Sequence, residues 1–191
     1  VKLIVERRGI GDILAEGTYR AAVEISKMKN LDVMQYAVQF KGIEVGAHGI
    51  RTGSHFPYLG YALSVQGGDH TSIPRPPMSE ARSTIGDSLV LCTMSGPSGL
   101  RNIEWDFFKA VTGWDMTAEE WTNVNGKRII QIQRAVLLLG GPDLFWEPEI
   151  HDDNPPRWYT PLPSGPYKDS APNREQLMIE RKEAYEAMGW D

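Results

Sequence analysis

The chain has 191 residues and a single cysteine, Cys92, so no internal disulfide can cross-link its fold. One thiolate also cannot complete a metal site, because zinc sites and iron–sulfur clusters take several protein ligands. Two interpretations stay open: a small buried side chain, or a ligand whose co-ligands come from elsewhere. Cys92 also ends a 26-residue stretch that begins with Gly67-Gly68-Asp69-His70.

Composition excludes several classes of protein. A hydrophobic fraction of 41% is ordinary for a globular chain and predicts a substantial core. The sequence has no run of about 18 apolar residues, so we expect no membrane insertion. The net charge of −5 disfavours broad nucleic-acid binding. A single cysteine suits a reducing compartment, and we expect a cytoplasmic protein.

Four segments have the apolar periodicity of helices, so we expect a mainly α, multi-helical fold with long irregular loops. The first helix should begin near Asp12, a candidate N-cap. Its apolar face would comprise Ile13, Leu14, Ala21, Ala22, Ile25 and Met28. The second helix should cover residues 102–112 and end at Gly113. Its inward side chains would be Trp105, Phe108 and Val111.

The third predicted helix has the clearest start, because Thr117 and Glu120 form a capping box. It should run to about Leu139 and bury Trp121, Val124, Ile129, Ile132 and Val136. The last helix should open at Asn173 and end near Gly189.

Two regions between these helices look irregular. Residues 42–87 combine many glycines, prolines and serines with aromatic and charged residues, which is typical of a functional loop. Residues 141–172 contain eight prolines and should wrap the surface in extended form. We divide the chain into residues 1–100, a helical segment with the candidate binding loop, and residues 101–191, a helical carboxy-terminal segment.

The loop residues allow more than one chemistry. His70 is either a loop histidine with local hydrogen bonds or a proton donor, and with His48 and His55 a three-histidine metal site is a further alternative. Gly67 and Gly68 would let the backbone approach a bulky group closely. Asp87 either caps a helix or turn that begins at Ser88, or accepts hydrogen bonds from an N–H-rich heterocycle such as a pterin.

Several segments match one family in the same order. They are Gly9-Ile10-Gly11-Asp12, Lys41-Gly42-Ile43-Glu44, Gly67-Gly68-Asp69-His70, Asp87-Ser88-Leu89-Val90-Leu91-Cys92 and the closing Gly189-Trp190-Asp191. On these motifs the chain resembles the C-terminal domains of the tungsten-containing aldehyde ferredoxin oxidoreductases. The matches extend over nearly the whole chain, which makes the resemblance specific although each motif alone is weak.

The resemblance implies a tungsten (or molybdenum) ion held by two pterins, with a [4Fe–4S] cluster close by. It places Asp87 on a pterin, together with the backbone that follows at Ser88 and Leu91. It makes Cys92 the last cluster ligand. It places His70 by the metal for proton transfer or substrate contact, and Gly68 and Asp69 on the cofactor side of the same loop.

The other three cluster cysteines precede this region in the family, so we expect them on an N-terminal portion of the same enzyme. The chain would then be a fragment or a natural split subunit that is inactive alone. Its partner in electron transfer would be ferredoxin or an electron-transfer subunit. The resemblance implies oxidation of aldehydes to carboxylic acids as the leading function.

Two departures from the family put that substrate in doubt. Val90 stands where the family has glycine, and only 21 residues separate His70 from Cys92. A shorter link would reshape the substrate cavity, so the tungsten subunit of class II benzoyl-coenzyme A reductase, which reduces an aromatic ring to a dienoyl-coenzyme A, is the alternative. A cofactor-free helical interaction module is a second alternative.

Overall fold

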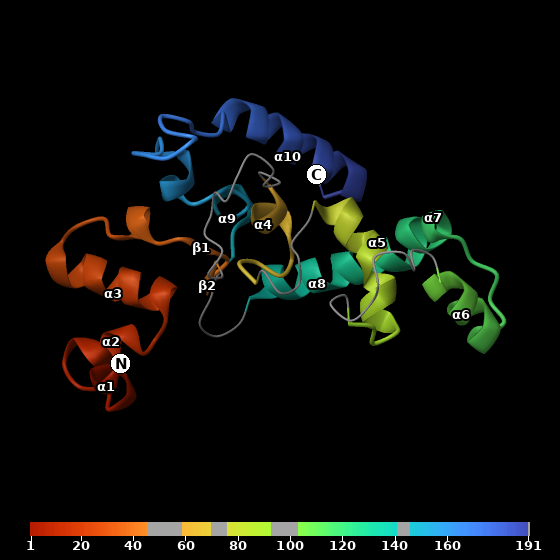
Figure 1. Ribbon diagram of the computed structural model, residues 1–191, viewed down its shortest axis with the longest axis horizontal. Helices are drawn as coiled ribbons and strands as arrows, with labels where there is room; N and C mark the ends of the chain where they lie inside the picture. Colours follow the sequence, from red (N-terminus) through yellow and green to blue (C-terminus); the bar gives the residue numbers. More distant parts are fainter. Residues whose placement is uncertain (46–58, 70–75, 93–102, 141–145, 191) are drawn as a thin grey trace.

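The computed structural model describes residues 1–45, 59–69, 76–92, 103–140 and 146–190. In Figure 1 these residues form an elongated body, with α1, α2 and α3 at one end and α6 and α7 at the other. The described residues are mainly helical, which confirms the expected fold class. Their two short strands, β1 (Gln39–Phe40) and β2 (Ile43–Glu44), pair antiparallel in a hairpin.

The amino-terminal region contains three helices where we expected one. They are α1 (Lys2–Val5), α2 (Ile10–Leu14) and α3 (Thr18–Lys29). Gly17 separates the last two with a φ of 85°, a conformation that glycine adopts without steric cost. Asp12 lies inside α2 and is not an N-cap; its carboxylate accepts a hydrogen bond of 2.8 Å from Arg7. The predicted apolar face holds only in part, because Ala21 and Ala22 are buried whereas Met28 is 63% exposed.

The second predicted helix is confirmed as α6 (Ile103–Thr112), and Gly113 ends it with a φ of 73°. Phe108 is buried in a core cluster with Trp121 and Ile85, and Trp105 packs against that cluster. Val111 is 82% exposed, so its predicted inward position is wrong.

The third predicted helix begins with the expected capping box. The Thr117 hydroxyl accepts from the Glu120 N–H at 3.2 Å, and the Glu120 carboxylate accepts from the Thr117 N–H at 2.8 Å. The helix consists of α7 (Ala118–Glu120), a π-helical stretch η3 (Trp121–Gly126) and α8 (Lys127–Leu139).

The buried face of α8 differs from the predicted one. Ile130 and Arg134 are buried, whereas Ile132 and Val136 are about 60% exposed. Gly126 explains which face of α8 is buried, because a Cβ built there would lie 2.1 Å from the Ala81 carbonyl oxygen of α5. Because Gly126 packs so closely on α5, the residues four and eight positions later, Ile130 and Arg134, also face α5. Apolar periodicity alone favours a different face of the helix.

Residues 42–87 are more regular than predicted. They contain α4 (Gly60–Leu63) and most of α5 (Pro77–Ser88), which has proline at its first position, where the missing N–H costs nothing. Beyond them, α9 (Pro148–His151) and the 3₁₀ turn η4 (Pro156–Tyr159) interrupt the proline-rich segment. A further 3₁₀ turn, η1 (Met34–Tyr36), lies between α3 and the strand hairpin.

The last predicted helix is confirmed as α10 (Arg174–Met188). The Asn173 side chain caps it by accepting from the N–H groups of Glu175 and Gln176, and Gly189 ends it in the left-handed conformation. Leu177 joins the largest core cluster, with Phe40, Tyr61, Leu63 and Trp158. That cluster combines residues from both predicted segments, and the boundary at residue 100 stays a prediction. Among the described residues, no helix has both the length and the apolarity needed to cross a bilayer.

Candidate functional site

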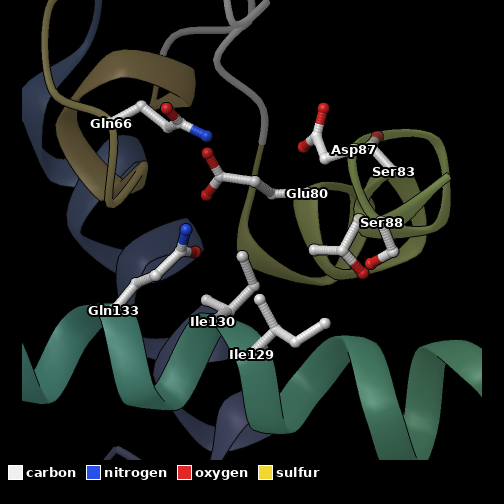
Figure 2. A pocket seen from close by; sticks show the side chains of 9 residues that line it. Gln66, Glu80, Ser83, Asp87, Ser88, Ile129, Ile130 and Gln133 are labelled. Carbon is white, nitrogen blue, oxygen red and sulfur yellow. The ribbon is translucent and has the colours of Figure 1, made fainter. Parts of the chain in front are cut away.

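A cavity of about 260 Å³ lies where α5 faces α8 and the segment of residues 64–69. Helix α5 contributes two carboxylates, Glu80 and Asp87, and the hydroxyl of Ser88. Gln66 adds an amide from the loop, as Gln133 does from α8, whose Ile129 and Ile130 supply an apolar wall. Figure 2 shows the Glu80 carboxylate between the two amides, with the Asp87 carboxylate beside it. The cavity therefore unites the predicted residues Asp87 and Ser88 with polar groups that sequence reasoning missed.

Glu80 is the buried acid of this cavity, with 6% of its surface exposed. Its carboxylate accepts hydrogen bonds from the Ser64 hydroxyl at 2.5 Å and from the Val65 N–H at 3.4 Å. Burial raises the pKa of the Glu80 carboxyl above its usual value, whereas these hydrogen bonds and the positive charge of Lys41 lower it. The charge of Glu80 therefore depends on Ser64, Val65 and Lys41, which favour the ionised form against the effect of burial.

The two glycines before Asp69 pack against the strand hairpin. Gly67 has a φ of 61°, and a Cβ there would lie 2.7 Å from the Phe40 carbonyl oxygen. A Cβ on Gly68 would lie 2.2 Å from the Ile43 carbonyl oxygen. The close backbone approach expected at these glycines is thus made to protein backbone. Contact of Gly68 and Asp69 with a cofactor stays a prediction.

The three loop histidines, His48, His55 and His70, lie outside the described residues, so the roles suggested for them stay predictions. Within the described ranges, no group of three or more His, Cys, Asp or Glu side chains is placed to hold a metal ion.

A buried network of charges connects the strand hairpin with α4, α8 and α9. Asp152, with no exposed surface, pairs with Lys41 at 3.1 Å and with Arg134 at 2.9 Å. Lys41 also donates to the Ala62 carbonyl, and Tyr185 donates to Asp152 at 2.5 Å. Burial lowers the pKa of Lys41, and the charge of Asp152 opposes that shift. The network holds α4, α8 and α9 together, and no sequence motif marks its members as partners.

Tyr185 gives this network a measurable pH dependence. Burial first, and the charge of Asp152 second, raise the pKa of Tyr185 from 10.0 to about 12. The folded protein therefore holds the phenolic proton more tightly than the unfolded chain does. We expect the free energy of unfolding to fall as the pH rises through the interval between these two pKa values.

Chemical denaturation of the purified protein across that pH interval measures the effect. In Tyr185→Phe the slope of stability against pH should be smaller, since the titrating hydroxyl is gone. Tyr36→Phe, at a position 62% exposed, is the control and should keep the wild-type slope. Equal slopes in the wild type and Tyr185→Phe would contradict the assignment.

The end of α5 explains the motif that runs from Asp87 to Cys92. The N–H of Val90 donates to the Asp87 carbonyl at 3.0 Å, and the N–H of Leu91 donates to the Gly86 carbonyl at 2.8 Å. These two bonds define a Schellman motif, in which the residue at the Val90 position adopts the left-handed conformation. Of the alternatives for Asp87, the cap of a helix that begins at Ser88 is wrong, because both residues belong to the last turn of α5, and a turn at Leu89 and Val90 follows.

Val90 occupies that left-handed position with a φ of 56°, although its side chain is β-branched and 90% exposed. Only glycine adopts this conformation without a steric penalty. We expect Val90→Gly to raise the free energy of unfolding by about 1 kcal/mol. Urea denaturation measures it, with Val111→Gly in the exposed face of α6 as a control that should lower stability by about 0.5 kcal/mol. A Val90→Gly protein less stable than the wild type would contradict the explanation.

Cys92 follows directly after this turn and is exposed, so its interpretation as a buried core side chain is wrong. Leu91 beside it is 51% exposed. A thiol in this position is accessible to a ligand outside the described residues. The Schellman turn fixes the direction in which the chain leaves α5, and thereby links the position of Cys92 to that of Asp87.

The residues present fit the groups that the sequence resemblance implies. The cavity offers carboxylate and amide acceptors beside an apolar wall, which suits a flat heterocycle rich in N–H groups. The exposed thiol of Cys92 suits one corner of an iron–sulfur cluster whose other ligands come from elsewhere.

Comparison with known proteins places the chain in context. Residues 1–191 match the family described as aldehyde ferredoxin oxidoreductase, domains 2 and 3. The aliphatic sulfonate oxidoreductase, WOR-like subunit, of Pyrococcus furiosus is 52% identical over 194 residues, covering 99% of this chain and 31% of that protein. The tungsten-containing aldehyde ferredoxin oxidoreductase of Pyrococcus furiosus is 26% identical over 216 residues, covering 100% of this chain and 33% of that protein. Its counterpart from Pyrococcus horikoshii is 26% identical over 213 residues, covering 98% and 32%. The chain thus spans about a third of the length of these relatives.

Proposed function

Because the chain belongs to the aldehyde ferredoxin oxidoreductase family, we propose that it forms the carboxy-terminal part of a tungsten–pterin oxidoreductase with a [4Fe–4S] cluster. The observation that carries the proposal is the junction at the end of α5. Asp87 and Ser88 line a polar cavity there, and the exposed thiol of Cys92 follows within one turn.

In this proposal Asp87 accepts hydrogen bonds from a pterin, with the backbone at Ser88 and Leu91 close to it. Cys92 supplies one thiolate to the cluster. The tungsten–pterin group, when bound, provides two-electron oxidation or reduction of the substrate, and the cluster passes electrons on singly. The chain itself orients the cofactor, and His70 would exchange a proton with the substrate. An electron-transfer subunit or ferredoxin would accept the electrons.

The substrate class proposed from the family is an aldehyde, oxidised to a carboxylic acid. A second candidate, an aliphatic sulfonate, is supported by the relative with 52% identity. That alignment spans 194 positions, close to the length of this chain, whereas the alignment with the Pyrococcus furiosus aldehyde enzyme spans 216. The aldehyde enzyme therefore has a longer corresponding region than this chain, and in this proposal the difference reshapes the substrate cavity.

An assay of the full-length holoenzyme, purified without oxygen, separates the candidates. Acetaldehyde, an alkanesulfonate and a dienoyl-coenzyme A thioester are each tested against viologen dyes of different potential. Turnover of the aldehyde alone supports the first candidate, and turnover of the sulfonate supports the second. Turnover of the thioester alone would overturn both and favour the aryl-coenzyme A alternative.

A further inference from the structure

The segment of residues 64–69 leads directly into position 70 and is held from two sides. On one side, Gly67 and Gly68 lie so close to the strand hairpin that a Cβ on either would meet a backbone oxygen at 2.7 Å or less. On the other side, the segment faces α5, where Glu80 projects toward it (Figure 2). The position of the segment relative to α5 therefore depends on what Glu80 contacts.

One carboxylate organises three consecutive residues of this segment. The two Glu80 oxygens accept from the Ser64 hydroxyl and from the Val65 N–H. The Ser64 hydroxyl oxygen in turn accepts from the Gln66 N–H at 3.0 Å. Ser64 has no exposed surface and Glu80 is 6% exposed, so water replaces these bonds only if the segment moves.

The same side chain also belongs to the cavity wall. Glu80 and Asp87 are seven residues apart on α5, which places them on one face of the helix, and both line the cavity. Glu80 thus joins two features that are otherwise separate: the segment that precedes residue 70 and the helix that ends at Asp87.

Charges around Glu80 come from each neighbouring element. Lys41 of the hairpin lowers the pKa of the carboxyl, and Asp87 of α5 raises it. The charge of Lys41 depends in turn on two neighbours: Asp152, after α9, raises the pKa of Lys41, and Arg134 of α8 lowers it. When all four are ionised, the buried charges of Lys41, Arg134, Asp152 and Glu80 sum to zero.

We propose that Glu80 is a positioning residue that fixes the 64–69 segment, and with it the chain entering position 70, relative to Asp87 and the cavity. The inference rests on the proposed function for its catalytic consequence, but its structural part is independent of it. Glu80 lies outside the segments that match the family motifs.

Glu80→Gln in the full-length holoenzyme tests the proposal. The substitution keeps the shape of the side chain, but an amide has one acceptor oxygen in place of two, so the Ser64 hydroxyl and the Val65 N–H can no longer both donate to it. Hydrogen–deuterium exchange of peptides covering residues 62–69 should accelerate about tenfold. The kcat should fall about tenfold, with KM, tungsten and iron contents unchanged.

Glu183→Gln, which removes the same charge from an exposed position on α10, is the matched control and should alter none of these quantities. If Glu80→Gln does not fold, Ser64→Ala provides a second route and should accelerate the same peptides. Unchanged exchange in both variants would overturn the proposal, as would a fall in kcat accompanied by loss of tungsten or iron. A wild-type enzyme without tungsten would instead overturn the proposed function, while the exchange measurement would still decide the role of Glu80.

Discussion

Cys92→Ser is expected to remove the iron–sulfur cluster from the full-length enzyme and to lower viologen-linked turnover at least about 100-fold, with tungsten retained. A serine hydroxyl is a poor substitute for a thiolate, because iron in such clusters prefers soft sulfur ligands. The Schellman turn is built from backbone groups of residues before Cys92, so the substitution leaves α5 and the cavity intact.

Iron analysis and electron paramagnetic resonance of the reduced enzyme measure the loss. Val111→Ser, at a position 82% exposed and remote from α5 in sequence, is the control and should keep full iron content. A Cys92→Ser enzyme with wild-type iron content would show that Cys92 is not a cluster ligand.

Asp152→Asn is expected to cause the largest loss of stability, about 3–5 kcal/mol in the free energy of unfolding. The substitution leaves the buried cations Lys41 and Arg134 without their shared counter-charge, and a buried uncompensated charge is costly. The aromatic rings around Arg134, among them Trp190 at 3.8 Å, compensate only part of that cost.

Chemical denaturation of the purified protein measures this loss. Asp32→Asn removes the same charge from an exposed position and should change stability by less than about 0.5 kcal/mol. A loss below about 1 kcal/mol in Asp152→Asn would contradict the importance assigned to the network.

The helix ends were predictable because their signals are local. The capping box at Thr117, the cap at Asn173 and the glycines at 113 and 189 each act through hydrogen bonds or backbone angles within a few residues. The buried faces were less predictable. Val111 and Val136 look like core residues by periodicity, but contacts distant in sequence decide which face is covered.

The candidate site likewise contains residues that a local motif indicates and residues that no motif indicates. The motif pointed to Asp87 and Ser88, and both residues line the cavity, while their contact with a cofactor stays a prediction. Glu80 and the pair of Lys41 with Asp152 were missed, because single charged residues far apart in sequence carry no pattern. The left-handed angle at Val90 had one signal, the glycine that the family has there, since valine itself argues against that conformation.

The most direct test of the central claim is the metal content of the full-length protein purified without oxygen from cells supplied with tungstate. We expect about one tungsten and about four irons per polypeptide, as one pterin-bound metal and one [4Fe–4S] cluster require. A folded, full-length protein that contains neither metal would contradict the claim and identify the chain as a cofactor-free member of the family.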